Sequence, residues 1–504
     1  MSSYILAHDL GTTGNKATLY DLSGNLCASA LYEYNTFFPK HNWVEQDPED
    51  WWKGVCISTR ELLDKAAINK KEIACISFSA QMMGCLPVDK SGAALRKSII
   101  WADQRATKEA KFMEDTLSME RVYKITGHRI SPSYSAAKLL WVKENEASIY
   151  KNTYKILHAK DYIIHKLTGK FLTDYSDASG MNLFDIRGKV WSKDILFQLG
   201  IEEGLMPEAH PSTDIAGGLL KQASLALGLL EGTPVVIGGG DGSCAAVGAG
   251  VVEEGRTYNV IGSSSWIAIA SKEPIYDKDM RTFNWVHLDP ELYSPCGTMQ
   301  TAGYSLNWLK NTLCELETIQ GKERGINTYK IIDEEIIKSP PGANNLLFLP
   351  YLIGERSPRW NPDAKGALVG LKMTSTKSDM YRSVLEGVGY NLKVIMDVFN
   401  EEMPLKEVIV IGGGAKSKVW LQILADIWQK NILVPKFLEE ATSMGAAICG
   451  GVGIKAFPDF KVINKFNKID YEIFPRLEYK ERYDKLFKLF NDTYEALIPI
   501  YRKL

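Results

Sequence analysis

The sequence predicts an α/β protein built from two related domains that enclose a cleft. Strand-like apolar runs alternate with helical patterns along the chain, which is typical of layered α/β folds. Two kinds of glycine-rich turn each occur once in either half, one at 11–14 and 262–265, the other at 238–240 and 412–414. This pairing indicates an ancient duplication. We place the boundary near residues 248–256, which gives domains over 1–250 and 251–504.

Length and composition exclude several classes of protein. The 504 residues are 45% apolar and 24% charged, as in an ordinary folded protein and unlike a disordered or fibrous one. The net charge of −2 gives no electrostatic reason to expect a nucleic acid or a membrane surface as partner. The N-terminal apolar run stops at Asp9 without a basic flank, so no secretory signal is predicted.

The cysteines and histidines form no metal-binding or disulfide pattern. Eight cysteines are scattered without a Cys-x-x-Cys pair, and the seven histidines show no zinc spacing. We interpret the cysteines as buried thiols of a protein in a reducing compartment and predict a cytoplasmic location.

The segment DLGTTGNK, residues 9–16, is a candidate phosphate-binding turn between two strands. Glycine lets backbone amides approach a phosphate, and Thr12 and Thr13 add hydroxyl donors. Asp9, directly before the turn, could hold a hydrated Mg²⁺ ion, the counter-charge that phosphoryl transfer needs. The segment is not a Walker A loop, since the four-residue gap and the Gly-Lys-Ser/Thr ending are missing. A hairpin turn without a ligand is the alternative.

Asp241 is the strongest candidate for a catalytic residue. It follows three glycines at the end of an apolar strand and begins a helix of small residues. The functional hypothesis is a base aimed into the cleft at a substrate hydroxyl, kept ionised by the helix N-terminus and a nearby Mg²⁺. A weak base suffices, because phosphoryl transfer needs mainly orientation and late proton acceptance. The structural alternative is an ordinary helix N-cap.

Two further turns offer places for the rest of a nucleotide. The turn GSSS at 262–265 has amides and hydroxyls for the other end of a triphosphate, although Gly-Ser turns are common. The turn at Gly413 and Gly414 opens a helix and could lie flat against an adenosine, with an ordinary strand-to-helix turn as the alternative.

Two long helices are expected in the C-terminal half. Residues 378–399 carry apolar side chains at an approximate one-face spacing, and residues 479–501 show a second amphipathic stripe. We interpret both stripes as core packing.

With these pieces in order, the chain resembles the FGGY family of carbohydrate kinases, and among them the xylulokinases. The resemblance runs nearly end to end and is most specific in SYSAAKLLWVKEN (133–145) and GALVGLKMTSTKSDMYRSVLE (366–386). The segments WVEQDPEDWW, IIWADQR, HAKDYIIHKLTG, LPYLIGERSP and LEGVGYNL are also similar. The resemblance implies a two-domain, actin-like or ribonuclease-H-like fold, in which ATP and a sugar meet in the interdomain cleft.

The resemblance also assigns roles by position. It implies Asp241 as catalytic base, and Asp9 and Asp241 as the residues associated with Mg²⁺. The residues implied for ATP are Gly11, Thr12, Thr13, Lys16, Gly262, Ser263, Ser264, Gly413, Gly414 and Ser417. Those implied for the sugar are Gln81, Met82, Met83, Trp101, Asp103, Arg105 and Asp241. The alternative is a core role for the methionines and a surface ion pair between Asp103 and Arg105.

The sequence departs from the xylulokinase pattern where the sugar would bind. Met83 stands where a histidine is usual, and Gly242 where an asparagine-like residue is usual. Both changes delete polar groups, and a site that pairs a hydroxyl discriminates strongly. The resemblance implies an ATP- and Mg²⁺-dependent kinase that converts D-xylulose to D-xylulose 5-phosphate, and the two departures keep another pentulose, a polyol or gluconate open as the alternative acceptor.

Two other classes of protein share some of these features. An actin-like or Hsp70-like ATPase would share the phosphate turns, but the chain lacks an appended peptide-binding domain and carries the sugar-kinase segments. A catalytically dead sugar sensor would be expected to lose Asp241 or to gain a DNA-binding module. The sequence leaves the oligomeric state open, with a homodimer as one alternative.

Overall fold

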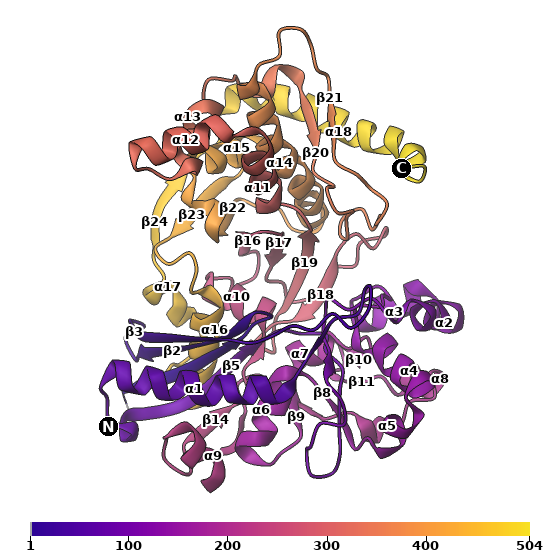
Figure 1. Cartoon of the computed structure of the whole chain (residues 1–504), viewed down its shortest axis with the longest axis vertical. Helices are drawn as coiled ribbons and strands as arrows, with labels where there is room; N and C mark the ends of the chain where they lie inside the picture. Colours follow the sequence, from indigo (N-terminus) through magenta and orange to yellow (C-terminus); the bar gives the residue numbers. More distant parts are fainter. Residues whose placement is uncertain (1–2) are drawn as a thin grey trace.

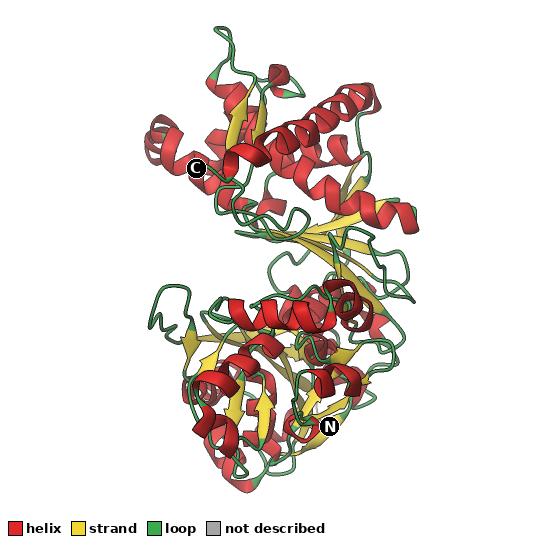
Figure 2. Cartoon of the chain, turned by 90° about the vertical axis from the view of Figure 1, so that its right-hand side faces the viewer, coloured by secondary structure: helices red, strands yellow, loops and turns green. Residues whose placement is uncertain are grey.

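The computed structural model describes residues 3–504, which form two lobes stacked along the long axis of Figure 1. The N-lobe holds the sheet of the N-terminal half and the C-lobe that of the C-terminal half, each with helices packed against it (Figure 2). Helix α16 (Ala441–Gly453) belongs to the C-terminal half by sequence but packs against the N-lobe sheet. The predicted α/β class is confirmed.

The N-lobe sheet combines an antiparallel meander with parallel strands. Its spatial order is β13 (Ile215–Gly218), β14 (Pro234–Val236), β5 (Ile73–Ala80), β1 (Tyr4–Leu10), β2 (Gly14–Asp21) and β3 (Leu26–Glu33), with β15 (Gly239–Gly240) also pairing with β5. Strands β1, β2 and β3 are antiparallel to one another, whereas β5 runs parallel to β1 and β14 parallel to β5.

The C-lobe sheet repeats this pairing in five of its strands. Its order is β18 (Phe283–Val286), β19 (Tyr293–Met299), β17 (Ser265–Ile269), β16 (Thr257–Ile261), β22 (Glu407–Ile411), β23 (Asn431–Pro435) and β24 (Ile469–Ile473). The succession β19-β17-β16-β22-β23 has the same parallel and antiparallel steps as β3-β2-β1-β5-β14. This shared topology agrees with the predicted duplication.

The two triple-glycine turns, however, are not a duplicated pair. The turn 238–240 follows β14, whose counterpart in the C-lobe is β23, whereas the turn 412–414 follows β22, the counterpart of β5. The two sequences are alike because both turns pass from a buried strand into a helix at a point where another backbone segment lies very close. A Cβ at Gly238 would lie 2.0 Å from the Phe78 carbonyl oxygen, and one at Gly412 would lie 2.7 Å from the Ile261 carbonyl oxygen.

Helix α10 (Asp241–Gly248) crosses α16 at the junction of the lobes, and small residues allow the close approach. A Cβ at Gly248 would lie 1.8 Å from the Ala441 carbonyl oxygen, and one at Gly445 would lie 1.9 Å from the Cys244 carbonyl oxygen. The small-residue composition of both helices is therefore required by their packing.

The two long helices predicted from the sequence are confirmed. Helix α14 (Lys377–Glu402) starts at a capping box formed by Thr376 and Asp379 and buries most of its residues. Helix α18 (Lys480–Tyr501) buries Tyr483, Leu486 and Phe490, the stripe expected for core packing. Both helices contribute to the large hydrophobic core of the C-lobe.

The remaining helices are α1 (Pro48–Ala66), α2 (Thr107–Leu117), α3 (Met119–Thr126), α4 (Ser135–Asn145), α5 (Ala147–Asn152), α6 (Ala159–Thr168), α7 (Tyr175–Ser179), α8 (Lys193–Gln198), α9 (Lys221–Leu227), α11 (Gly303–Leu313), α12 (Glu315–Arg324), α13 (Thr328–Ile336), α15 (Lys418–Trp428) and α17 (Ile463–Phe466). Short strands pair as β4 (Glu45–Gln46) with β7 (Ser98–Ile99), β6 (Leu86–Val88) with β8 (Lys155–Leu157), β9 (Leu172–Asp174) with β12 (Glu208–His210), β10 (Phe184–Asp185) with β11 (Val190–Trp191), and β20 (Leu347–Leu349) with β21 (Ala367–Val369).

Within residues 3–504, every helix is too short or too polar to cross a bilayer. All eight cysteines are free thiols, and Cys27 alone is exposed.

Candidate functional site

The turn between β1 and β2 faces the junction of the lobes and carries the first predicted residues. It closes through a hydrogen bond from the Gly11 amide to the Gly14 carbonyl, 3.0 Å long. The indole Nε1 of Trp101 donates to Thr12 Oγ1 at 2.9 Å, while Thr13 is exposed to solvent. The turn therefore presents both a backbone amide face and a hydroxyl-bearing side chain.

Asp9 occupies the end of β1, just before this turn. Ser79, on the neighbouring strand β5, donates to Asp9 Oδ1 at 3.0 Å. Burial raises the pKa of Asp9 to about 6, against the opposing effects of the Ser79 hydroxyl and the Lys16 charge. Lys16 itself lies 3.8 Å from Glu440 of the C-terminal half and is partly exposed.

Gln81 stabilises the β1–β2 turn through Gln46. Its Nε2 donates to Gln46 Oε1 at 2.7 Å, and Gln46 Nε2 in turn donates to the Thr12 carbonyl at 2.6 Å. Both glutamine side chains are buried. In this structure Gln81 contacts the β1–β2 turn rather than a cavity.

The turn between β16 and β17 is the C-lobe counterpart of the β1–β2 turn. The Gly262 amide donates to the Ser264 carbonyl at 3.0 Å, which closes the turn as in the N-lobe. The Ser263 carbonyl accepts from the amides of Ala302 and Tyr304 at the start of α11. A Cβ at Gly303 would lie 2.3 Å from the Gly262 carbonyl oxygen, so the helix and the turn pack backbone to backbone.

A cavity of about 570 Å³ opens beside this turn, and residues of the C-lobe alone line it; we call it the C-lobe cavity. Its walls come from the β16–β17 turn, from α11 and α13, and from the turn that precedes α15. The lining residues are Ile261, Gly262, Ser263, Gly303, Tyr304, Leu306, Asn307, Asn327, Tyr329, Lys330, Asp333, Gly413, Gly414, Lys416, Ser417 and Trp420. Five of the predicted nucleotide residues thus lie around one cavity.

The glycine turn and Ser417 form one wall of the C-lobe cavity. Residues Gly413–Lys416 make a short 3₁₀ turn, and α15 begins only at Lys418, with Ser417 as its N-cap. The helix therefore starts later than the sequence predicted. The Ser417 hydroxyl donates to the Asp333 carboxylate at 2.9 Å, and burial raises the pKa of Asp333 to about 6.

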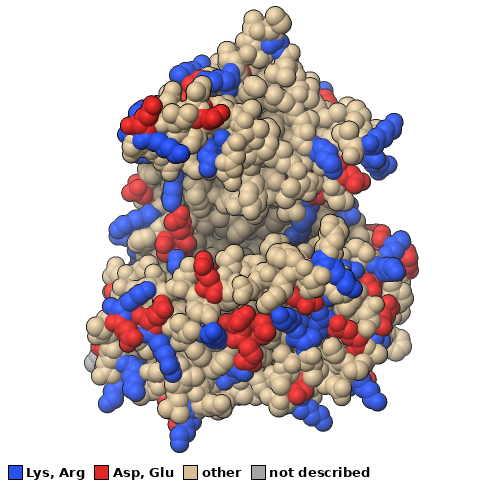
Figure 3. Space-filling model, viewed as in Figure 1, with Lys and Arg blue, Asp and Glu red and all other residues tan. Residues whose placement is uncertain are grey.

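A second cavity, of about 230 Å³, lies between the lobes; we call it the cleft cavity. Aromatic and thioether side chains dominate its walls, with Asp241 and Arg356 as its charged residues. The lining residues are Met82, Met83, Trp101, Asp241, Gly242, Tyr258, Ser264, Trp266, Ala268, Phe283, Trp285, Ser294, Cys296, Thr298 and Arg356. The space-filling view shows a hollow between the lobes whose visible floor is largely uncharged (Figure 3).

Asp241 is the first residue of α10 and lines the cleft cavity. Gly240 is the N-cap, and the Asp241 carboxylate accepts from the amide of Gly242 at 2.7 Å, so the helix-cap alternative is not what the structure contains. Asp241 is exposed to the cleft, but desolvation by the surrounding walls, followed by the negative charge of Asp9, raises its pKa to about 7. These two effects outweigh the helix N-terminus, which was expected to keep the carboxylate ionised.

Asp9 and Asp241 lie close enough for each charge to be felt by the other. Two neighbouring carboxylates that repel each other form a hard oxygen donor set, which a divalent cation would stabilise. Mg²⁺ favours one or two carboxylates together with phosphate oxygens over an all-protein cage. The residues present therefore fit the predicted Mg²⁺ ion.

Met83 has an unusual backbone in the wall of the cleft cavity. Its φ of 62° lies in the left-handed region, which non-glycine residues rarely adopt. The buried Lys138 ammonium donates to the Met83 carbonyl at 2.8 Å and holds the peptide in place. Strained backbone of this kind is often found at functional sites.

Asp103 and Arg105 form a buried ion pair instead of lining the cleft cavity. Arg105 Nη2 lies 2.7 Å from Asp103 Oδ2 and 2.8 Å from Glu45 Oε1, and its guanidinium stacks over the rings of Trp43 and Trp141. The pair is fully desolvated, so the surface ion pair considered as the alternative is wrong. In this structure both side chains are occupied in holding the 43–45 segment.

The two cavities meet at the β16–β17 turn. Gly262 and Ser263 line the C-lobe cavity, and Ser264, the next residue, lines the cleft cavity. A group bound in the first cavity can therefore reach the second by passing over three residues of backbone.

Several lining residues were missed by the sequence analysis. Trp266 directly follows the predicted turn, so its position beside a ligand could have been inferred from the sequence. Asp333 and Trp285 come from segments whose local pattern shows nothing of the cavity they reach, whereas Arg356 belongs to the family-like segment LPYLIGERSP. Only the tertiary packing of the lobes brings them to the site.

Comparison with known proteins identifies the family. The model described as "FGGY family of carbohydrate kinases, N-terminal domain" matches residues 4–248, and that of the C-terminal domain matches residues 257–454. A xylulose kinase of Bacillus subtilis is 32% identical over 493 residues, which are 97% of this chain and 96% of the relative. A gluconokinase of Bacillus licheniformis is 30% identical over an alignment of 506 positions, which covers 100% of this chain and 98% of the relative.

Solved structures agree over the whole length of the chain. A gluconate kinase from Lactobacillus acidophilus superposes with a TM-score of 0.93 at 27% identity, and a ligand-bound xylulose kinase from the same organism with a TM-score of 0.92 at 28% identity. Each comparison covers 99% of both chains. The lobes and their arrangement are thus those of solved sugar kinases, which confirms the predicted two-domain fold.

Proposed function

This chain belongs to the FGGY family of carbohydrate kinases, and we propose that it transfers the γ-phosphate of ATP to a hydroxyl of a small open-chain sugar, with D-xylulose as the first candidate and D-xylulose 5-phosphate as product. In this proposal residues 251–504 bind the nucleotide. Residues 1–250 supply the catalytic carboxylate and much of the sugar site.

The observation that carries the proposal is the junction of the two cavities at the β16–β17 turn. The C-lobe cavity has the volume and the flat glycine wall that an adenosine needs, and it ends at the amides of Gly262 and Ser263. The cleft cavity begins at Ser264 and contains Asp241. A triphosphate that runs from the first cavity to the second directs its terminal phosphoryl group at Asp241.

The transfer step then follows from the placement of these groups. The acceptor oxygen attacks the γ-phosphorus while the bond from that phosphorus to the β–γ bridging oxygen breaks, and ADP leaves with the electron pair. The hydroxyl proton passes to the Asp241 carboxylate. The β1–β2 and β16–β17 turns donate amides and hydroxyls to the phosphate oxygens, and closure of the lobes excludes water that would otherwise attack the phosphorus.

We assign Asp9 and Asp241 to Mg²⁺. When bound, the ion neutralises charge on the phosphate oxygens. The carboxylates would hold it beside the β1–β2 turn, where Thr12 and Thr13 lie. Positive charge at this position also lowers the pKa of Asp241 from about 7, which keeps more of the carboxylate in the basic form at neutral pH.

The walls of the cleft cavity support a small acceptor with apolar faces. Trp101, Trp266 and Trp285 offer flat surfaces on which the carbon face of a sugar can stack. Polar groups are sparse, as expected from Met83 and Gly242, so few hydroxyls are recognised individually. D-xylulose fits this cavity of about 230 Å³ by size.

A sugar acid such as gluconate is the second candidate, and Arg356 favours it. The Arg356 guanidinium lines the cleft cavity, and within residues 3–504 no carboxylate forms an ion pair with it. Tyr134 lies beside it. A carboxylate on the acceptor would pair with this cation in a planar, two-bond geometry. Relatives of similar identity include gluconokinases as well as xylulose kinases.

An acceptor screen tests the proposal. ADP release is measured with D-xylulose, other pentuloses, glycerol and D-gluconate at equal concentrations, and kcat/KM is compared. The proposal predicts that D-xylulose exceeds glycerol and the other acceptors. A tenfold preference for gluconate would replace D-xylulose by the second candidate, and turnover with none of them would refute the sugar kinase proposal. Arg356→Gln serves as the matched variant, since it should weaken gluconate more than xylulose.

A further inference from the structure

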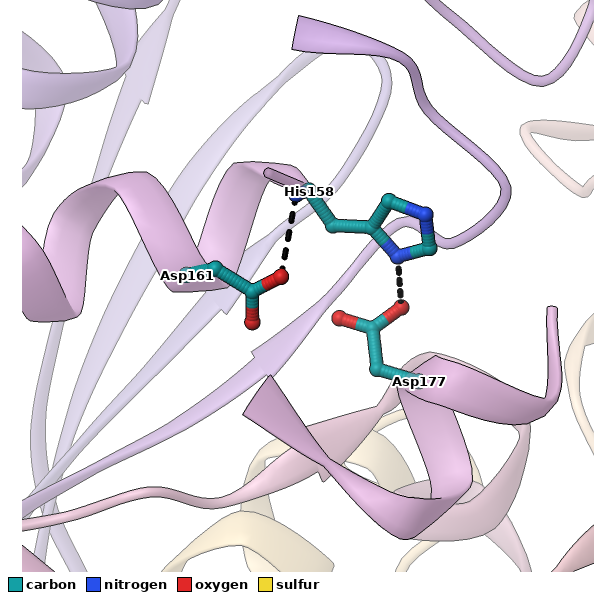
Figure 4. A group of neighbouring side chains, drawn as sticks. All are labelled: His158, Asp161 and Asp177. Atoms are coloured by element: carbon teal, nitrogen blue, oxygen red, sulfur yellow. Dashed lines mark hydrogen bonds and ion pairs between the residues drawn. The ribbon is translucent and has the colours of Figure 1, made fainter. Parts of the chain in front are cut away.

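A buried network of charged side chains in the N-lobe has no part in the proposed phosphoryl transfer. Lys160 Nζ lies 2.9 Å from Asp161 Oδ1, 3.1 Å from Asp174 Oδ1 and 3.5 Å from Asp177 Oδ2. His158, the residue before α6, forms a short hydrogen bond with Asp177 of α7 (Figure 4). All five side chains are at most 1% exposed. Burying so many charges is costly unless they are paired, which points to a specific role.

The spacing of His158, Asp161 and Asp177 would allow a metal ion, but the charges argue against one. The Lys160 ammonium already contacts the carboxylates of Asp161 and Asp177. A divalent cation among the same oxygens would be repelled by this ammonium at short range. The group is therefore an ion cluster held together by its own lysine.

One arm of the cluster leads to Asp241. Asp174 Oδ2 accepts from Ser176 Oγ at 2.5 Å, and Ser176 Oγ accepts from the Gly240 amide at 3.0 Å. Gly240 directly precedes Asp241, so this bond fixes the peptide from which the Asp241 carboxylate projects. Ser212 donates to the same Asp174 oxygen at 2.7 Å and stiffens this arm.

The other arm leads to the Met82–Gly84 turn in the wall of the cleft cavity. Ser135 donates its only hydroxyl proton to the Gly84 carbonyl at 2.6 Å, so His158 Nε2, 2.9 Å from Ser135 Oγ, must carry a proton and donate. Burial alone would lower the pKa of His158, but the Asp177 carboxylate outweighs it and raises the pKa. The chain Asp177–His158–Ser135 therefore holds the carbonyl of the residue that follows Met83.

The two arms meet again at the cavity wall. A Cβ at Gly240 would lie 2.3 Å from Met82 Sδ, so the Met82 side chain covers the peptide that precedes Asp241. A Cβ at Gly180, which ends α7, would lie 3.2 Å from Met83 Cγ and 3.2 Å from a ring carbon of Trp285. Helix α7 thus contacts the cleft cavity wall in two places, at the peptide that precedes Asp241 and at the side chains of Met83 and Trp285.

We propose that the 174–180 segment, anchored by Lys160, is a positioning bracket in which Ser176 aligns Asp241 for proton acceptance and the His158–Ser135 arm aligns the Met82–Gly84 turn for acceptor binding. This inference rests on the proposed function, because alignment matters only if a hydroxyl is activated in the cleft cavity. Misplacing a catalytic group by about 1 Å can cost up to a hundredfold in rate, which makes such a bracket useful.

Single serine variants separate the two arms. Ser176→Ala should lower kcat about tenfold with little change in the KM for the acceptor, because the base is displaced while the sugar wall is intact. Ser135→Ala should raise the acceptor KM about fivefold and change kcat less. Neither should alter the KM for ATP. Ser378→Ala, which removes a buried serine bonded to Glu335 in the C-lobe, is the control and should leave all three parameters unchanged.

Hydrogen–deuterium exchange provides a readout that needs no turnover. Ser176→Ala should speed exchange in a peptide covering 239–243, and Ser135→Ala in a peptide covering 82–86, each without affecting the other. If both variants lose thermal stability to the same extent but show no kinetic split and no segment-specific exchange, the network is merely structural and the inference is wrong. If the wild type phosphorylates no acceptor, the proposed function fails, and the exchange pattern alone decides whether the two arms exist.

Discussion

The β1–β2 and β16–β17 turns occupy equivalent places in the two sheets, and their comparison shows how one scaffold serves two tasks. Each turn closes on itself through a glycine amide, Gly11 or Gly262, at 3.0 Å. Each is also braced by a buried polar pair across its strands: His8 with Asn15 at 3.0 Å in the N-lobe, and the Asn259 amide with the Ser265 hydroxyl at 2.7 Å in the C-lobe.

The two turns differ at the second residue before the glycine. The N-lobe has Asp9 there and the C-lobe has Val260, which faces the same way along its strand. Both turns can offer amides to a phosphate chain, but only the N-lobe turn adds a carboxylate. The comparison teaches that a duplicated backbone can supply both ends of a phosphate site, while the chemistry comes from residues that the copies do not share.

Removal of Asp241 should have the largest effect. Asp241→Asn keeps the shape of the side chain but removes the proton acceptor, so we expect kcat to fall roughly a hundredfold or more while ATP binding persists. Steady-state kinetics and nucleotide titration measure the two quantities separately. Turnover at the wild-type rate would remove Asp241 from the role of base.

Asp9 and Val260 provide a direct test of the asymmetry between the turns. Asp9→Asn should raise the Mg²⁺ concentration needed for half-maximal rate by about tenfold to a hundredfold, the usual cost of losing a residue that orients a bound ion and its ligands. Val260→Thr, at the matched position, should leave the Mg²⁺ requirement unchanged. Equal responses of the two variants would contradict the assignment of the ion to the N-lobe turn.

Gly413 and Gly242 offer a pair of substitutions that should separate the two cavities. A Cβ at either position meets no protein atom within 4 Å, so a larger side chain can be placed without a clash. Gly413→Val projects into the C-lobe cavity and should raise the KM for ATP about tenfold, whereas Gly242→Val should raise the acceptor KM by a similar factor. The reverse pattern would show that the ligands were assigned to the wrong cavities.

Met83→His should sharpen the choice of acceptor. Histidine tolerates the left-handed backbone that Met83 adopts, with φ at 62°, and it restores a polar group to the cleft cavity. We expect kcat/KM for D-xylulose to rise about fivefold, since one added hydrogen bond to a hydroxyl is worth about 1 kcal/mol. A rise for gluconate alone would indicate that the cavity is built for a sugar acid.

The effect of His8 should be on stability alone. Burial lowers the pKa of His8 to about 3 from 6.5, so the unfolded chain binds the proton first as the pH falls. The contribution of this residue is intact above pH 6.5 and is lost progressively toward pH 3, with about 2 kcal/mol lost by pH 5. Chemical denaturation at pH 7 and pH 5 should therefore show a smaller pH dependence in His8→Phe than in the wild type.

Local chemistry made much of the site predictable from the sequence. The glycine and hydroxyl turns, Asp241 after its glycines and the amphipathic helices of the C-lobe are signalled by neighbouring residues, and the structure has them as expected. Short-range patterns of this kind depend on backbone geometry that a few residues decide.

What could not be predicted depends on contacts between distant segments. The Asp103–Arg105 pair is buried because Glu45, Trp43 and Trp141 converge on it from elsewhere in the N-lobe. Asp333 reaches its cavity through the packing of the C-lobe, and no local motif marks it. The two triple-glycine turns were predicted to be a duplicated pair, and this prediction is wrong. Similar turns arise wherever a buried strand passes tightly into a helix.

The central claim is that a triphosphate lies between the two turns with Asp241 at the acceptor hydroxyl. A crystal structure with Mg²⁺, a non-hydrolysable ATP analogue and the preferred acceptor tests it most directly. The account predicts that a carboxylate oxygen of Asp241 lies about 3 Å from the acceptor oxygen, with that oxygen in line with the γ-phosphorus. A fully closed complex in which Asp241 lies far from every acceptor hydroxyl would contradict it.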